Sequence, residues 1–298
     1  MLPISDMFLT VFTPIYNRRK FLGRILESLL RQERSDIEWL IVDDGSDDGT
    51  KSVISTLRDK APFPVRYHRI TRGGKHRAYN SALELAKGEL FLTLDSDDWL
   101  PDGIIDTIEA NYEVLRNDSG LCGLIGLKAD SVGRIYGRRF KEGVLMAADR
   151  VTFEDIFCTG ERCLVLNTQI ARRYPFPTFA GELFMTESVV YSRLGVDFGF
   201  GLVDQVLSFC EYQSDGLSKR IHSLLCQNPL GFMLYHSQCI NHAISFKAAF
   251  NAALRYVAFR SMAGRRAGEA THTGRYRWLI NLLAPLGPVG KLYYRLRN

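Results

Sequence analysis

The chain has 298 residues, of which 46% are hydrophobic and 24% charged, a composition typical of a packed soluble protein and not of a disordered or fibrous one. Its formal net charge of +5 is unevenly divided: the segment from Phe246 to Asn298 holds ten basic residues and one acid, a net of +9. Residues 1–245 hold the other 28 basic and 32 acidic residues, a net of −4. The length indicates one catalytic-sized domain with an appendage.

The first hundred residues alternate between short apolar runs and helical patterns. Apolar, β-branched runs predict four strands, the first ended by Pro14: Phe8–Thr13, Trp39–Val42, Val65–Ile70 and Leu90–Leu94. Between them, apolar residues recur at helical spacing within Phe21–Leu30, Val53–Leu57 and His76–Ala86. This alternation predicts an α/β fold with a mostly parallel sheet covered by helices on both faces. Right-handed crossovers bring the carboxyl ends of such strands to one edge, where open α/β folds bind ligands.

Polar clusters stand at the end of each predicted strand, so we expect them to meet at that edge. They are Thr13–Asn17 (TPIYN), Asp43–Ser46 (DDGS), Arg72–Lys75 (RGGK) and Asp95–Asp98 (DSDD). A dinucleotide site is excluded, because no GxGxxG follows the first strand. An EF-hand starting at Asp44 is excluded as well, because its twelfth position is Ser55 and not Glu.

The spacing of Asp95 and Asp97 places two carboxylates on one side of a strand end. At ~4 Å two such charges repel each other by about 4 kcal/mol at an effective dielectric of about 20, so a cation between them is favoured. Carboxylate and diphosphate oxygens suit Mg²⁺ or Mn²⁺. Arg72 and Lys75, on a Gly-Gly turn, are positioned to approach the same phosphates. The alternative is a solvated turn before a helix that begins near Pro101.

The Asp43–Ser46 cluster has two interpretations. Asp47 and Asp48 are suited to cap the helix that follows. For Asp44, fixed at the strand end, contact with a ligand is favoured over capping.

Five motifs, in this order and spacing, resemble the family-2 glycosyltransferases of the GT-A fold: TPIYNR, SLLRQ, EWLIVDDGSDDGT, GGKHRAYN and LDSDD. The resemblance is densest from Phe8 to Leu100. It implies an inverting, metal-dependent enzyme that moves a sugar from a nucleotide-diphosphate donor, a UDP-sugar, to a hydroxyl of a glycan or lipid-linked acceptor. Bacterial surface polysaccharide synthesis is the process it suggests.

The same resemblance assigns roles to individual residues. Thr13, Pro14 and Tyr16 would line the nucleotide pocket, and Asp44 would read the base. Asp95 would face the ribose or the metal, Asp97 would be the principal metal ligand, and Asp98 either belongs to this pattern or caps the next helix.

A second stretch, Pro175–Gly195, resembles the family segment that supplies the catalytic carboxylate. Glu187 is the best match, as the first residue of a helix capped by Thr186, and Glu182 is the reserve candidate. The helix dipole favours the ionised form of a carboxylate at this position, whereas burial raises its pKa.

We predict a catalytic domain over residues 1–220, with a nucleotide-binding half (1–100) and an acceptor half (101–220), and a basic amphipathic helical extension over residues 221–298. Apolar and basic residues alternate at helical spacing in Ile244–Phe259 and Val289–Leu296. These helices either dock on the catalytic body or contact an anionic membrane from one side, where each basic residue contributes about 1 kcal/mol. Nucleic acid is not expected as a partner, because no RNA-binding motif is present.

No apolar stretch approaches the roughly twenty residues that span a bilayer. The six cysteines form no CxxC pair, which indicates free thiols in a reducing compartment. The expected location is therefore the cytoplasm, with the inner face of the cell membrane as the place of peripheral contact.

Two other functions remain open from the sequence. A sugar-1-phosphate nucleotidyltransferase shares this sheet but needs a glycine-rich cationic loop after the first strand, where this chain has TPIYNRR. A non-catalytic sugar-nucleotide-binding protein would not need Asp95, Asp97 and a carboxylate base together.

Overall fold

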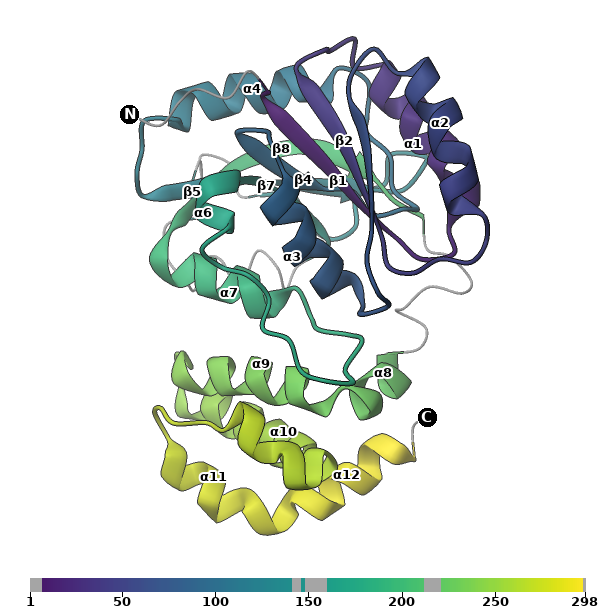
Figure 1. Ribbon diagram of the computed structural model, residues 1–298. Coiled ribbons are helices and arrows are strands. Elements are labelled where there is room, and N and C mark those ends of the chain that lie inside the picture. Colours follow the sequence, from purple (N-terminus) through teal and green to yellow (C-terminus); the bar gives the residue numbers. More distant parts are fainter. Residues whose placement is uncertain (1–6, 141–145, 148–159, 212–220, 297–298) are drawn as a thin grey trace. The chain divides into compact units, whose positions relative to one another are not determined.

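The computed structural model describes residues 7–140, 146–147, 160–211 and 221–296 (Figure 1). The chain divides into two compact units. The sheet unit comprises Met1–Pro175 and Arg193–Tyr212, and the helical unit comprises Phe176–Ser192 and Gln213–Asn298. The predicted acceptor half, residues 101–220, therefore contributes to both units.

In the described residues the sheet unit contains one eight-stranded sheet, in the order β3-β2-β1-β4-β7-β5-β8-β6. Strands β3, β2, β1 and β4 are parallel, β7 runs antiparallel to both of its neighbours, β5 and β8 are parallel, and β6 is antiparallel to β8. The strands are β1 Leu9–Ile15, β2 Ile37–Asp43, β3 Val65–Arg69, β4 Leu90–Thr93, β5 Leu121–Ala129, β6 Met146–Ala147, β7 Arg162–Asn167 and β8 Gly199–Phe209.

Helices connect the first strands as the apolar spacing predicts, which confirms the α/β alternation. They are the 3₁₀ helix η1 Arg19–Phe21, then α1 Leu22–Leu30, α2 Thr50–Lys60, α3 Lys75–Leu85, α4 Ile104–Leu115, α6 Thr168–Ala171 and α7 Ser188–Asp197. The helix expected near Pro101 begins at Ile104, and the one expected to start with Glu187 begins one residue later.

The prediction that Pro14 ends the first strand is wrong, because β1 continues through Pro14 to Ile15. On the β4 side, the last hydrogen bond along β1 is the one that the Phe12 carbonyl accepts from Leu94 N. On the β2 side, the Ile15 carbonyl accepts a hydrogen bond from Asp44 N. Since alternate residues of a parallel strand face the same neighbour, the missing N–H of Pro14 faces the β4 side beyond the last paired residue. Proline therefore removes no ladder hydrogen bond here.

The two faces of the sheet bury different helices (Figure 1). Leu9, Val11 and Ile15 of β1 belong to a buried cluster that includes the apolar residues of α1, α2 and α4. Phe12 points to the opposite face and stacks on Phe91 of β4, with 5.5 Å between the ring centroids; Tyr79 of α3 meets Phe91 edge-on there. With both faces covered, the ligand-binding groups are left to the ends of the strands.

The helical unit has a core of its own, centred on α10. Its elements are α8 Ile221–Gln227, α9 Pro229–Asn241, α10 Phe246–Ala263, η3 Gly264–Ala270, α11 Arg277–Leu283, η4 Ala284–Leu286 and α12 Gly287–Arg295. Ser245 caps α10, because its hydroxyl accepts a hydrogen bond from Ala248 N at 3.2 Å. Among the described residues, none of the helices combines the length and the apolar character required to cross a bilayer.

We predict that Gly123→Ala destabilises the sheet unit by about 1–3 kcal/mol, because overpacking forces backbone shifts. Gly123 lies in β5 at φ +154°, and a Cβ there would lie 2.1 Å from the backbone oxygen of Val165 in β7. Gly23→Ala is the matched control: Gly23 lies in α1 with open space around it, so alanine should raise the free energy of unfolding by about 0.5–1 kcal/mol. Urea unfolding measures both, and changes of the same sign would contradict the prediction.

Candidate active site

The ends of β1 and β2 are tied together by a network around Asp43. The buried Asp43 carboxylate accepts hydrogen bonds from Ser46 N at 2.7 Å and from the Tyr67 hydroxyl at 2.5 Å. Asn17, at the end of β1, donates its backbone N–H to Ser46 Oγ and accepts from Asp47 N. These bonds fix the DDGS turn next to the TPIYN segment, as expected for clusters at one edge of the sheet.

Asp44 holds the glycine loop that carries Arg72. Its carboxylate accepts hydrogen bonds from Gly73 N at 2.6 Å and from Gly74 N at 2.8 Å, and Arg72 Nη1 lies 2.6 Å from Oδ2. Gly74 has a φ of +92°, a conformation that favours glycine, so the sequence supplies the residue that the loop requires. Asp44 thus positions the cationic loop, and its contact with a nucleotide base stays a prediction.

The guanidinium of Arg72 lies over the ring of Tyr16, with its carbon 3.3 Å from the ring centroid. Both side chains are 41% exposed, so the pair forms an accessible cation–π platform. An open hollow beside Arg72 is lined also by Gly45, Arg69, Ile70 and Thr71.

Thr13 and Pro14, the other predicted pocket residues, are placed differently. Pro14 is half-buried, whereas Thr13 is fully buried and its hydroxyl accepts a hydrogen bond from Trp39 Nε1 at 3.0 Å. The Thr13 side chain therefore supports the sheet, and of the three residues only Tyr16 is exposed.

The acidic turn after β4, residues Asp95–Asp98, meets two lysines. Lys75 Nζ lies 2.5 Å from Asp95 Oδ1, and Lys128 Nζ, from β5, lies 2.7 Å from Asp98 Oδ2. Asp97 forms no ion pair with the described residues. The alternative of Asp98 as a helix cap is wrong, because its buried carboxylate binds Lys128.

The electrostatics of this turn favour a further cation. Burial opposes the ionisation of Asp95, but the charges of Lys75 and Lys128 outweigh it and lower the pKa of Asp95. Burial, reinforced by the charge of Asp95, raises the pKa of Asp97. Burial also raises the pKa of Asp98 to about 7, against the pull of Lys128. The two lysines pair with Asp95 and Asp98, whereas Asp97 forms no ion pair in the described part of the chain, and the charges of Arg18 and Lys75 offset only part of the rise in its pKa.

Asp95 and Asp97 have the donor atoms that Mg²⁺ or Mn²⁺ requires. Within the described ranges, no group of three or more His, Cys, Asp and Glu side chains is arranged to hold a metal ion. A pair of carboxylates suits an ion that takes its remaining ligands from substrate phosphates and water. Asp97, which forms no ion pair with a described residue, fits such an ion, whereas Asp98 is already paired with Lys128.

Sequence reasoning missed two residues that hold this turn. Arg24 of α1 donates to the backbone carbonyl of Asp97, lies 3.0 Å from Glu211 and stacks 4.2 Å from the centre of the Trp99 ring. Lys128 is the second. The sequence contains a sign of the role of Lys128, because it is the one charged residue in the apolar run Leu121–Ala129. Arg24 gives no such sign, because it lies in an ordinary amphipathic pattern.

Glu187 and Glu182 belong to the helical unit and have different surroundings. Glu187 is half-buried directly before α7, and its carbonyl accepts from Val190 N at 2.9 Å and Tyr191 N at 3.1 Å. Glu182 is 2% exposed, and its two carboxylate oxygens accept from Leu230 N and Gly231 N in the first turn of α9. Burial raises the pKa of Glu182 against these two amide bonds. Glu182 therefore caps α9, and the assignment of Glu187 as the base stays a prediction.

Residues 10–157 match the family described as Glycosyl transferase family 2. The chain belongs to this family. The relatives include an uncharacterised glycosyltransferase of Nostoc sp., 36% identical over 35% of this chain and 32% of that protein. Staphylococcus aureus TarS, a poly(ribitol-phosphate) β-N-acetylglucosaminyltransferase, is 34% identical over 49% of this chain and 26% of its own length. The chain thus spans about a third or less of these curated relatives.

Solved structures share the fold of this family-2 chain. Residues 1–349 of S. aureus TarS superpose with a TM-score of 0.60 at 14% identity, over 98% of this chain and 92% of that one. The mannosyltransferase PcManGT of Pyrobaculum calidifontis, solved with GDP-Man and Mn²⁺, gives a TM-score of 0.52 at 18% identity, over 99% of this chain and 85% of that one. The predicted GT-A fold with a helical extension is thereby confirmed.

Proposed function

We propose that this family-2 chain transfers a sugar from a nucleotide-diphosphate donor to an acceptor hydroxyl, with inversion at the anomeric carbon. The observation that carries the proposal is the acidic turn Asp95–Asp98, in which Asp95 and Asp98 pair with lysines while Asp97 adds a carboxylate that no ion pair of the described residues neutralises. That excess negative charge lies beside the cationic loop of Arg72 and Lys75, so one edge of the sheet offers groups for a divalent ion and for a diphosphate.

The donor side of the reaction rests on the residues around Arg72. The exposed Tyr16–Arg72 platform offers a cationic and aromatic surface to a nucleotide, and Asp44 holds Arg72 in place. We propose a UDP-sugar as the donor, because TarS, 34% identical over half of this chain, has been solved with UDP-GlcNAc. The acceptor would be a glycan or a lipid-linked saccharide in bacterial surface polysaccharide synthesis.

Departure of the nucleoside diphosphate needs positive charge at the acidic turn. A divalent ion bound there supplies Lewis acidity that stabilises the charge developing on the leaving group. Asp95 and Asp97 would hold this ion. Lys75, now paired with Asp95, lies in the first turn of α3 and is positioned to turn to the diphosphate oxygens.

Attack by the acceptor needs a base, and Glu187 is the residue we propose. It would take the proton of the acceptor hydroxyl as that oxygen attacks the anomeric carbon from the face opposite the leaving group. A single displacement of this kind inverts the configuration. The dipole of α7 favours the ionised form of a carboxylate at its N-terminus, which is the form that this role requires.

We predict that Asp97→Asn lowers Mn²⁺-dependent transfer about a thousandfold, because the ion supplies several kcal/mol of stabilisation to the leaving group. Thermal shift against a panel of nucleotide sugars, with and without Mn²⁺, identifies the donor first, and product release then measures turnover. Asp102→Asn is the control, since Asp102 is an exposed carboxylate paired with Arg31. Full Mn²⁺-dependent activity in Asp97→Asn would overturn the metal assignment.

We predict that Glu187→Gln lowers transfer about 10²–10⁴-fold while donor binding and Tm remain, as loss of a general base should. Glu182→Gln should lower Tm and leave transfer unchanged. It replaces one of the two oxygens that accept from α9, so Tm falls while the folded enzyme keeps its turnover. Near-normal transfer by Glu187→Gln would exclude it as the base.

We also propose that the helical unit contacts an anionic lipid surface. Helix α12 packs on α10 through Gly290, where a Cβ would lie 2.6 Å from the Cβ of Ala258, and through Tyr294, whose ring centroid lies 5.0 Å from that of Phe259. Its large apolar residues, spaced along one stripe, are left exposed: Val289, Leu292, Tyr293 and Leu296. Exposed Trp278 of α11 stacks on exposed Phe246 and adds to the apolar surface.

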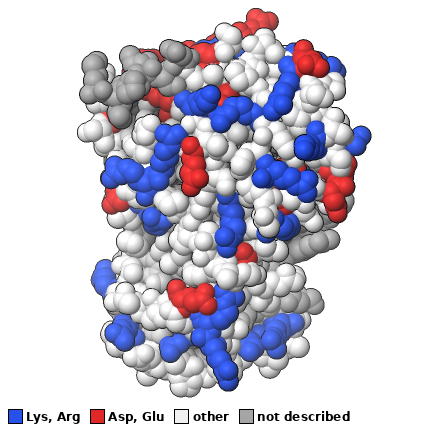
Figure 2. Space-filling model, in the orientation of Figure 1, with Lys and Arg blue, Asp and Glu red and all other residues white. Residues whose placement is uncertain are grey.

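The charge of this unit fits such a surface. Where its helices come into view in Figure 2, Lys and Arg lie between white patches with little acid. The only acid after Phe246 is Glu269, which already binds Arg266 at 2.9 Å. Apolar insertion and basic residues together are the two signals that stable peripheral binding requires.

We predict that Leu292→Ser with Leu296→Ser lowers binding to anionic vesicles about tenfold, because about 1.4 kcal/mol of apolar contact is lost. Flotation of the full chain measures this. The control is Val114→Ser with Val132→Ser, two apolar residues of the sheet unit that are 82% and 72% exposed. Equal binding by both double variants would contradict membrane contact through α12.

A further inference from the structure

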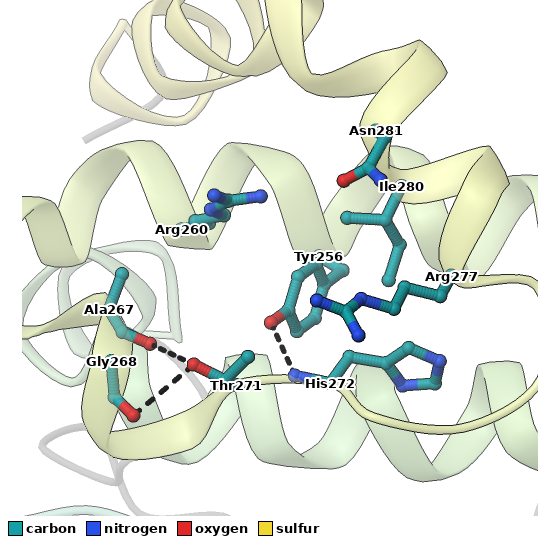
Figure 3. A pocket seen from close by; sticks show the side chains of 9 residues that line it. All are labelled: Tyr256, Arg260, Ala267, Gly268, Thr271, His272, Arg277, Ile280 and Asn281. Atoms are coloured by element: carbon teal, nitrogen blue, oxygen red, sulfur yellow. Dashed lines mark hydrogen bonds between the residues drawn. The ribbon is translucent and has the colours of Figure 1, made fainter.

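A cavity of about 200 Å³ opens at the surface of the helical unit, between α10, η3 and α11 (Figure 3), and the side chains of Arg260, Arg277 and Asn281 at its rim are exposed. Its volume is several times the ~30 Å³ that one water occupies, so it admits a small ligand group. The lining residues come from the three elements and the segment before α11: Tyr256, Arg260, Ala267, Gly268, Thr271, His272, Arg277, Ile280 and Asn281.

The floor of the cavity is fixed by buried hydrogen bonds. The Tyr256 hydroxyl accepts from His272 N at 2.9 Å and donates to the Ala270 carbonyl. The His272 ring lies between Ser237 Oγ, 2.8 Å from Nδ1, and the Arg275 carbonyl, 2.7 Å from Nε2. Because a carbonyl only accepts, Nε2 carries the proton. Both ring nitrogens are thus engaged, and residues 270–275 are held in place whether or not a ligand binds.

Two arginines line this cavity without a carboxylate. Arg260 comes from α10 and Arg277 from α11, and Figure 3 shows the Arg277 guanidinium beside Tyr256 and Arg260 farther along α10. No lining residue is acidic, and within the described part of the chain neither arginine forms an ion pair. Glu269, the one acid nearby in sequence, binds Arg266 through two hydrogen bonds. Two like charges at one cavity repel each other, so an anion between them is favoured.

The hydrogen-bond donors that line the cavity favour a phosphate over a carboxylate. Thr271 directs its hydroxyl to the carbonyls of Ala267 and Gly268, which leaves the arginine forks and the Asn281 amide as the polar groups for a ligand. Guanidinium forks match phosphate oxygens in pairs, and a phosphate group offers three oxygens to donors on different sides, whereas a carboxylate offers two.

We propose that this cavity is a binding site for a phosphate or diphosphate group, held by Arg260 and Arg277 with Asn281. It lies wholly in the helical unit and shares no residue with the donor site at the sheet edge, so it goes beyond the proposed transferase function. The phosphate could be free in solution or carried by a lipid, since the chemistry is the same.

The test is the thermal shift of the full chain with inorganic pyrophosphate, in EDTA so that no metal complex forms. Pyrophosphate should raise Tm of the wild type, and Arg260→Gln with Arg277→Gln should weaken binding at least tenfold. The charge-matched control is Arg255→Gln with Arg265→Gln, two exposed arginines of the same unit that do not line the cavity. It should keep the wild-type response. Asn281→Asp, which places a negative charge in the cavity, should remove binding without removing an arginine.

The proposal is overturned if pyrophosphate leaves Tm of the wild type unchanged, or if the cavity variant and the control respond equally. Vesicles of phosphatidylcholine with phosphatidic acid, compared with phosphatidylglycerol, then separate the two sources. A loss of flotation by the cavity variant on phosphatidic acid alone assigns a lipid-borne phosphate monoester. Equal flotation of variant and control on both lipids assigns a soluble phosphate compound.

Discussion

The hydrogen bonds between the Asp44 carboxylate and the glycine loop are the interaction on which the arrangement of the candidate active site depends. Three hydrogen bonds to one buried carboxylate fix Arg72, Gly73 and Gly74, and the loop leads directly into α3. Lys75 follows in the first turn of that helix and reaches Asp95 after β4. The end of β2 is therefore connected, through one loop and one lysine, to the acidic turn two strands away. Charge at this edge is arranged by the backbone and does not rely on flexible side chains alone.

The three carboxylates of the acidic turn Asp95–Asp98 have different partners and therefore different roles. Asp98 is paired with a lysine from β5, so it belongs to the packing of the sheet. Asp95 shares its charge with Lys75, and Asp97 has no paired cation among the described residues. Arg24 holds the backbone of the turn from α1. A site built in this way keeps excess negative charge in place at the cost of electrostatic repulsion, which a bound cation relieves.

Local patterns predicted the strands, the helices and the clusters at their ends, because each of these depends on neighbours in sequence. Partners across long distances could not be predicted in this way. Lys128 meets Asp98 thirty residues away, and Glu182 caps a helix that begins 47 residues later; both pairings require the tertiary fold. The end of the first strand was placed wrongly at Pro14 for a related reason. Whether a proline ends a strand depends on where the neighbouring strand, here β4, stops pairing with it. The outward stripe of α12 was visible as a pattern, but the packing of Gly290 on Ala258 and of Tyr294 on Phe259 is needed to show which side of the helix faces the core.

The packing of α12 on α10 separates the stability of this helix from the chemistry of its apolar stripe, two properties that depend on the same residues in most helices. An ordinary amphipathic helix uses its apolar side to fold, so any change to that side changes stability. Helix α12 docks through Gly290 and Tyr294 and leaves the stripe from Val289 to Leu296 outside the core. Its exposed side can therefore change in size and charge without loss of the fold, so the surface chemistry of the helical unit is independent of its stability.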